Sequence, residues 1–159
     1  MEIKMKTSKN PVEDQVVEST EVINEVENKD TVPKYPQEEL LAIFDEILFS
    51  GEYTEDVSIK NRLKVSLRSR TAAETNSISK ELDSKTFNLV MTMQQERSFL
   101  HLVYSLISYA GKDLKEMSIE KKKDFVGGLP VVIVAALSDA LITFDEKINL
   151  ACLEGDQNF

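Results

Sequence analysis

The residues best suited to chemistry in this 159-residue chain are its single histidine and its single cysteine. His101 is a candidate general base, because an imidazole titrates near neutral pH. Ser98 stands three positions before it, so the Glu-x-x-His pair of a di-iron carboxylate centre is not present. His101 also shares a narrow polar stripe of an otherwise apolar helix with Gln94, Arg97, Ser105 and Ser108. We therefore interpret His101 as a surface or hydrogen-bonded polar residue rather than a catalytic base.

Cys152 has a poor setting for a nucleophile, which needs a nearby base and positive surroundings. It falls on the apolar stripe of the last predicted helix, and the acids Glu146, Glu154 and Asp156 lie around it. A lone cysteine also forms no internal disulfide. The pattern predicts a thiol buried in the core.

Neither the paired acids nor the paired glycines form a recognisable site. Successive side chains on a helix point about 100° apart, so Asp45-Glu46 and Asp145-Glu146 each lack the facing geometry of two catalytic carboxylates. Gly127-Gly128 has neither the lysine spacing of a phosphate-binding loop nor a dinucleotide-binding pattern. We expect no catalytic residues, no metal site and no cofactor, and hence a protein that is not an enzyme.

Positive charge is concentrated on one predicted strand, although the chain carries a formal net charge of −9. If the strand stays regular, the face opposite its apolar residues carries Arg62, Lys64, Arg68 and Arg70. This basic face is either solvated and paired with Asp56, Glu55 or an acidic arm, or it is a site for an acidic partner. The negative net charge disfavours nucleic acids and anionic membranes as partners.

Residues 53–74 must position these charges. Apolar residues alternate in residues 53–59 and again in 63–67, and the alternation is interrupted at Lys60-Asn61, which predicts a β-hairpin. Thr71 and Glu74 then have the spacing of a capping box, so a helix is predicted from residue 72 to about 83.

Four further helices are predicted, over residues 36–49, 85–109, 119–126 and from Leu129-Pro130 to about residue 153. The third helix of the chain is apolar over most of its circumference in residues 99–109. Two interpretations are open: this helix is central to the domain, or one of its faces, including Tyr104 and Ile107, contacts another chain.

The last helix has one clear apolar stripe and two apolar residues beside it. The stripe predicts a core face made of Ile133, Val134, Leu137, Ala140, Leu141, Phe144, Ile148 and Cys152. Val131 and Ile142 lie together off this stripe and mark a second contact surface. The most apolar run, residues 129–144, includes Asp139 and is shorter than the roughly 20 residues of a membrane-spanning helix.

These elements predict a mainly α fold with a small β-hairpin (α+β), a compact domain of about five helices. The predicted organisation is a disordered acidic arm (1–34), one helical domain (35–153) with the hairpin at 53–68, and a short tail (154–159). Lys4 and Lys6 are not followed by an apolar run, so we expect no secretory signal and a cytosolic protein.

The order of these segments resembles that of the tail assembly chaperones of tailed bacteriophages over about residues 40–150. The segments that carry the resemblance are the hairpin, the junction 68–74, the apolar helix 99–109 closed by residues 111–114, the Leu129-Pro130 break, and the helix through residues 144–147.

That resemblance implies a non-catalytic protein of the host cytoplasm that binds the long helical tape measure protein, keeps it soluble and recruits tail-tube subunits. The alternative is a structural virion component of the tail, baseplate or head-tail connector. A second copy of the chain, forming a homo-oligomer, is a further candidate partner. The surfaces proposed for the partner are the apolar residues Tyr104, Ile107, Val131 and Ile142 and the basic residues Arg62, Lys64, Arg68 and Arg70.

Overall fold

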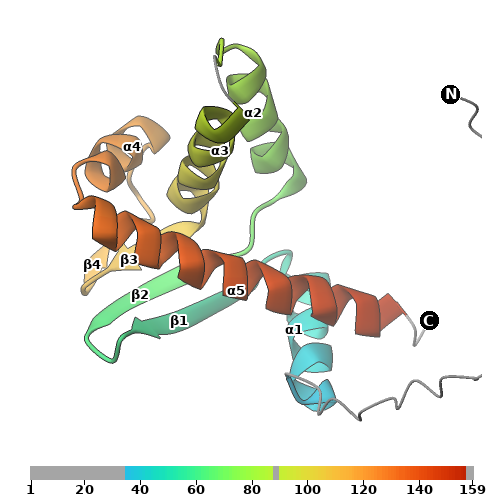
Figure 1. Cartoon of the computed structure of the whole chain (residues 1–159). Helices are drawn as coiled ribbons and strands as arrows, with labels where there is room; N and C mark the ends of the chain where they lie inside the picture. The colour runs from blue at the N-terminus through green and yellow to red at the C-terminus, as the bar shows by residue number, and fades with distance from the viewer. Residues whose placement is uncertain (1–34, 88–89, 157–159) are drawn as a thin grey trace, which may run out of the picture. The chain divides into compact units, whose positions relative to one another are not determined.

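The computed structural model describes residues 35–87 and 90–156. In chain order the elements are α1 (Gln37–Ser50), β1 (Thr54–Ile59), β2 (Leu63–Arg68), α2 (Ala72–Asp83), α3 (Val90–Ser105), β3 (Leu106–Tyr109), β4 (Lys112–Asp113), α4 (Ile119–Gly127) and α5 (Val131–Asp156) (Figure 1). The described residues thus form five helices and a small antiparallel sheet, which confirms the mainly α fold class. The acidic arm and the end of the tail, residues 157–159, lie outside the described residues.

The predicted hairpin and capping box are both present. Strands β1 and β2 pair antiparallel around a tight turn in which Lys60 and Asn61 have φ angles of 50° and 55°. The Thr71 hydroxyl accepts a hydrogen bond from the Glu74 backbone N–H, and the Glu74 carboxylate accepts one from the Thr71 N–H. Helix α2 therefore begins where the sequence predicts.

Residues 106–109 are the main correction to the predicted elements, because they form strand β3 and not the last turn of a helix. The strand pairs with β2 through Val65↔Tyr109, Ser66↔Ser108 and Leu67↔Leu106. The buried ammonium of Lys122 also donates a hydrogen bond of 3.1 Å to the Leu106 carbonyl, just past the helix end. The predicted hairpin is thereby extended into a four-stranded sheet in the order β1-β2-β3-β4.

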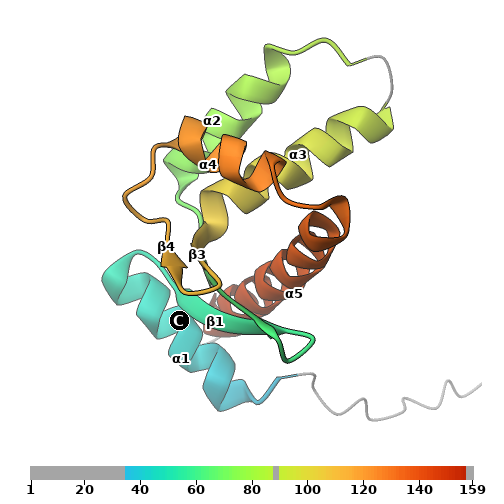
Figure 2. The same ribbon diagram turned by 90° about the vertical axis from the view of Figure 1, so that its left-hand side faces the viewer.

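The main core lies between this sheet, α3 and α5. Its buried residues are Val65, Leu67, Leu102, Val103, Leu106, Leu114, Val126, Leu137, Leu141 and Phe144. Two smaller clusters adjoin it: α1 packs on the C-terminal half of α5, and α2 packs on α3 (Figure 2). Leu100, Leu102 and Val103 are accordingly buried within the chain, and Phe99 and Tyr104 are partly buried against the same clusters, so α3 is a central helix of the domain.

Cys152 is exposed, so the prediction of a core thiol is wrong. The buried face of α5 runs from Leu137, Leu141 and Phe144 to Ala151 and Gly155, and not to Cys152. Leu40 and Ile43 of α1 pack against Ala151, which moves the buried face by about one residue at this end of the helix.

Gly155 gives the first testable prediction. A Cβ atom at this position would lie 2.4 Å from Cγ of Phe44, far inside van der Waals contact. We expect Gly155→Ala to lower the free energy of unfolding by about 1 to 3 kcal/mol in a urea melt, although alanine is the better helix former.

Gly127→Ala is the matched control. Its added Cβ would meet no atom within 4 Å, and its φ angle is not positive. This variant should be neutral or stabilising by up to about 1 kcal/mol. Equal tolerance of alanine at both glycines would contradict the close packing of α1 on α5.

Candidate functional site

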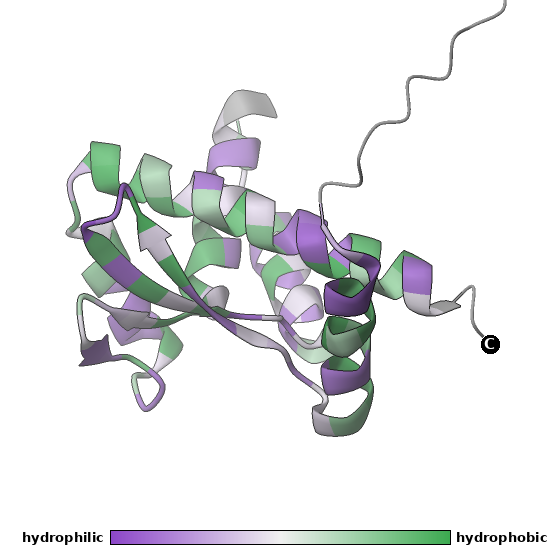
Figure 3. Ribbon diagram, turned by 90° about the horizontal axis from the view of Figure 1, so that it is seen from below, coloured by the Kyte–Doolittle hydropathy of each residue, from purple (hydrophilic) through white to green (hydrophobic). Residues whose placement is uncertain are grey.

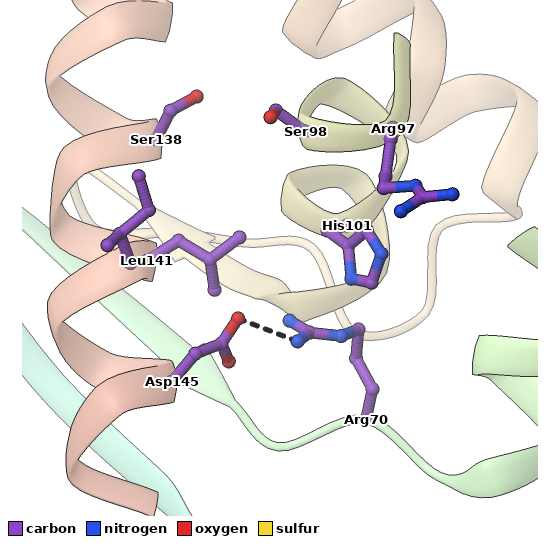
Figure 4. A pocket seen from close by; sticks show the side chains of 8 residues that line it. Arg70, Arg97, Ser98, His101, Ser138, Leu141 and Asp145 are labelled. Atoms are coloured by element: carbon purple, nitrogen blue, oxygen red, sulfur yellow. Dashed lines mark hydrogen bonds and ion pairs between the residues drawn. The ribbon is translucent and has the colours of Figure 1, made fainter. Parts of the chain in front are cut away.

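A partly buried arginine, Arg70, joins the segment after β2 to both α3 and α5 (Figure 4). Nη1 of Arg70 donates to Oγ of Ser105 at 2.6 Å, and Nη2 donates to Oδ2 of Asp145 at 2.7 Å. The Arg70 side chain is 13% exposed, and its Nε–H makes no hydrogen bond within the described chain. The guanidinium is therefore fixed in place with donor capacity left over.

A pocket of about 210 Å³ opens beside this arginine. It is lined by Arg70, Arg97, Ser98, His101, Ser138, Leu141, Ile142 and Asp145. The α3 residues have the spacing i, i+1, i+4, and the α5 residues have the spacing i, i+3, i+4, i+7. One face of each helix thus lines the pocket, and Figure 4 shows Ser98 and Ser138 facing each other across it.

His101 lies in this pocket as a neutral polar group. Burial, together with the positive charges of Arg70 and Arg97, holds the pKa of the imidazole below its ordinary value. Among the described residues, no hydrogen bond links His101 to a serine or to the Asp145 carboxylate. No nucleophile–base pair is assembled here, and the described chain holds no cluster of three or more His, Cys, Asp or Glu side chains suited to a metal ion.

Arg97 stands at the rim of the pocket. Its side chain is exposed and forms no ion pair with any described residue. In Figure 4 its guanidinium lies on the side of His101 that faces away from α5. Since Asp145 compensates only Arg70, the pocket retains one uncompensated positive charge.

A second and larger pocket, of about 510 Å³, continues from the first along the same two helices. It is lined by Gln94, Gln95, Ser98, Phe99, Val131, Val134, Ala135 and Ser138. Ser98 and Ser138 belong to both pockets, so the two form one channel, which we call the α3–α5 groove.

Apolar residues on the rim of the α3–α5 groove are exposed to solvent. Val131 is 83% exposed and Ile142 is 65% exposed, and both line the groove. The first turn of α5, where Val131 lies, is also hydrophobic in Figure 3. From Val131 to Asp145 the helix rises about 21 Å, which is the length of about four turns of a partner helix.

Of the apolar residues predicted to bind a partner, the structure brings two together. Val131 and Ile142 lie on the groove, whereas Tyr104 is half-buried and packs against the cluster of Ile78, Leu82 and Leu100. Ile107 lies in β3 and is 3% exposed. The structure therefore places Tyr104 and Ile107 in the packing of the domain, and Ile107 offers no surface for a partner.

The predicted basic face is divided among separate contacts. Arg62 lies in the β1–β2 turn, and Lys64 is exposed on β2. Arg68 forms an ion pair with Glu74. Arg70 lies after the end of β2, and its side chain forms an ion pair with Asp145. Burial alone raises the pKa of the Glu74 carboxyl, but hydrogen bonds from Arg68 and Thr71 bring it below its usual value. Of these four basic residues, Arg70 alone lines the α3–α5 groove.

The pocket is not predicted from the sequence, because His101 and Asp145 lie far apart in the chain and no local spacing relates them. The available signal was the polar stripe Gln94, Arg97, His101 and Ser105, three members of which line the groove while Ser105 accepts a hydrogen bond from Arg70. A polar stripe on a helix whose other sides are buried marks the side that faces solvent, a partner or a cavity.

Comparison of the chain with protein-family models, with curated proteins and with solved structures finds no match. None of the described helices is both long and apolar enough to cross a membrane.

Proposed function

We propose that this protein is a non-catalytic phage tail assembly chaperone whose α3–α5 groove binds an amphipathic helix of the tape measure protein. In this role it keeps the tape measure protein soluble and helps to recruit tail-tube subunits. The order of its segments, which resembles that of tail assembly chaperones, supports the class of protein, and the groove supports the mode of binding.

The observation that carries this proposal is the pair of exposed apolar residues on the rim of the α3–α5 groove. Val131 and Ile142 are eleven residues apart, so they face the same side of α5 about 16 Å from each other. The residues between them on the groove, including Val134 and Ala135, are small or apolar. An apolar stripe on a partner helix would match the length of this apolar rim and would bury these side chains on binding.

The second prediction tests this groove by co-expression with the tape measure protein and pull-down. Val131→Asp and Ile142→Asp should each lower capture by about tenfold or more, because an unpaired carboxylate would be buried in an apolar contact. Asp is well tolerated in the first turn of a helix, so Val131→Asp should remain folded.

Val132→Asp is the matched control, since Val132 is 73% exposed on the same turn of α5 but does not line the groove. It should leave capture close to that of the wild type. Equal loss in Val131→Asp and Val132→Asp, or capture that survives both Val131→Asp and Ile142→Asp, would overturn the groove as the binding site.

Particle composition separates this function from the alternative of a structural virion component. A chaperone is absent or present in traces in purified mature virions, whereas a tail, baseplate or connector subunit is stoichiometric. Stoichiometric incorporation would replace the chaperone assignment with the structural one.

A further inference from the structure

The α3–α5 groove is chemically different at its two ends. The end near Val131 is lined by apolar, serine and glutamine side chains, while the end near Asp145 contains Arg70, Arg97 and His101. At this second end an apolar helix would bury Ile142, but it would also take charged groups away from water without offering them a partner.

We propose that the pocket of Arg70, Arg97 and His101 binds a single carboxylate carried on a short apolar stem. This inference rests on the proposed function for its source: the carboxylate is that of an Asp or Glu side chain on the captured helix. It fixes the direction in which that helix lies in the groove, because only one end of the groove accepts the charge.

The charges in the pocket favour a carboxylate with one negative charge. Asp145 already pairs with Arg70, which leaves Arg97 as the one uncompensated charge among the lining residues. Its exposed side chain lies beyond His101, and its guanidinium turns toward the pocket to meet the carboxylate. A dianion such as phosphate would be repelled by the Asp145 carboxylate once Arg97 is neutralised. The planar guanidinium of Arg97 also matches the two oxygens of a carboxylate.

The other lining groups suit the remaining parts of such a ligand. Ser98, Ser138 and the neutral imidazole of His101 can donate hydrogen bonds to a carboxylate oxygen. Leu141 and the exposed Ile142 offer apolar surface to the stem. The chain as a whole carries a net charge of −9, so the rest of its surface repels anions. Binding of a carboxylate would therefore be confined to this pocket.

The single histidine of the chain makes the test direct, since its ring signals in a ¹H–¹³C NMR spectrum report on this pocket alone. The full chain is titrated at neutral pH and constant ionic strength with butyrate, with its uncharged analogue butyramide, and with inorganic phosphate. Butyrate should shift the His101 signals in a saturable manner in the millimolar range, and butyramide should not.

Two arginine variants locate the effect. Arg97→Gln should weaken butyrate binding by about fivefold or more, because it removes the uncompensated charge. Arg62→Gln, which changes an exposed arginine outside the groove, should leave the titration unchanged. Equal responses to butyrate and butyramide, a titration unaffected by Arg97→Gln, or tighter binding of phosphate than of butyrate would each overturn the carboxylate site.

No tape measure protein enters this titration, so its outcome is independent of the pull-down. Failure of the titration would remove the carboxylate site and leave capture by the groove intact. Saturable butyrate binding combined with failed capture would retain the pocket and remove the partner helix as the source of the carboxylate.

Discussion

Leu141→Ala is expected to lower the free energy of unfolding by about 2 to 5 kcal/mol, measured by urea denaturation. Leu141 is 4% exposed and belongs to the main core between the sheet, α3 and α5. Truncation to alanine removes buried apolar surface and leaves a space that the rigid elements around it fill only partly. Because Leu141 also borders the groove pocket, water can enter that space, and the loss should fall in the lower half of the range.

Ile142→Ala is the matched control for this prediction. Ile142 is the next residue on α5 and is 65% exposed, so its truncation should change stability by no more than about 0.5 kcal/mol. A loss below about 1 kcal/mol in Leu141→Ala, or equal losses at the two positions, would place the core face of α5 elsewhere.

Asp145→Leu is expected to lower the free energy of unfolding by about 2 to 4 kcal/mol. The change leaves the guanidinium of Arg70, whose side chain is 13% exposed, without its carboxylate partner. Ser105 remains as an acceptor but carries no charge. Breaking a largely buried ion pair by removal of one partner is strongly destabilising, since the remaining charge stays away from water.

Arg70→Met should cost less than Asp145→Leu, because Asp145 is 31% exposed and can turn toward water when it loses its partner. The double variant Arg70→Met/Asp145→Leu should be more stable than Asp145→Leu alone, since no charge is then left unpaired. Additive losses in this cycle would show that the pair contributes no coupling energy and that the two residues act independently.

The local elements of this fold follow from short-range patterns. The Thr71 hydroxyl and the Glu74 carboxylate form the capping box because both groups lie within one turn of the same chain. Similarly, Ser118 caps α4, and Gly51 ends α1 with a φ angle of 80°. Such contacts depend on neighbours three or four positions away, so composition and spacing are sufficient to predict them.

Strand β3 depends on a partner far away in sequence. Leu106, Ile107 and Tyr109 fit a helix or a strand equally well by hydrophobicity, and the preceding residues are helical. Pairing with β2, about 40 residues earlier, decides the outcome by satisfying the backbone hydrogen bonds of residues 106–109. The hydrophobic periodicity of one segment contains no information about a pairing partner so far away in the sequence.

In the candidate site, too, some features were predicted from local pattern and others depend on long-range contacts. That Val131 and Ile142 lie off the core stripe was predicted, and their exposure confirms this. The predicted continuation of the basic face to Arg70 is wrong, because the strand ends at Arg68 and the Arg70 side chain reaches Asp145, 75 positions further along the chain.

Short-range pattern was therefore sufficient to predict the helical class, the hairpin, the caps and the exposed apolar positions of α5, since each follows from contacts within a few residues. Long-range packing places α3 beside α5, with His101, Arg97, Arg70 and Asp145 around one pocket. These four side chains come from three separate segments, and their distances are set by the packing of the core between those segments. Residues that meet through such packing are selected by shape and burial, and they have no characteristic spacing in the sequence.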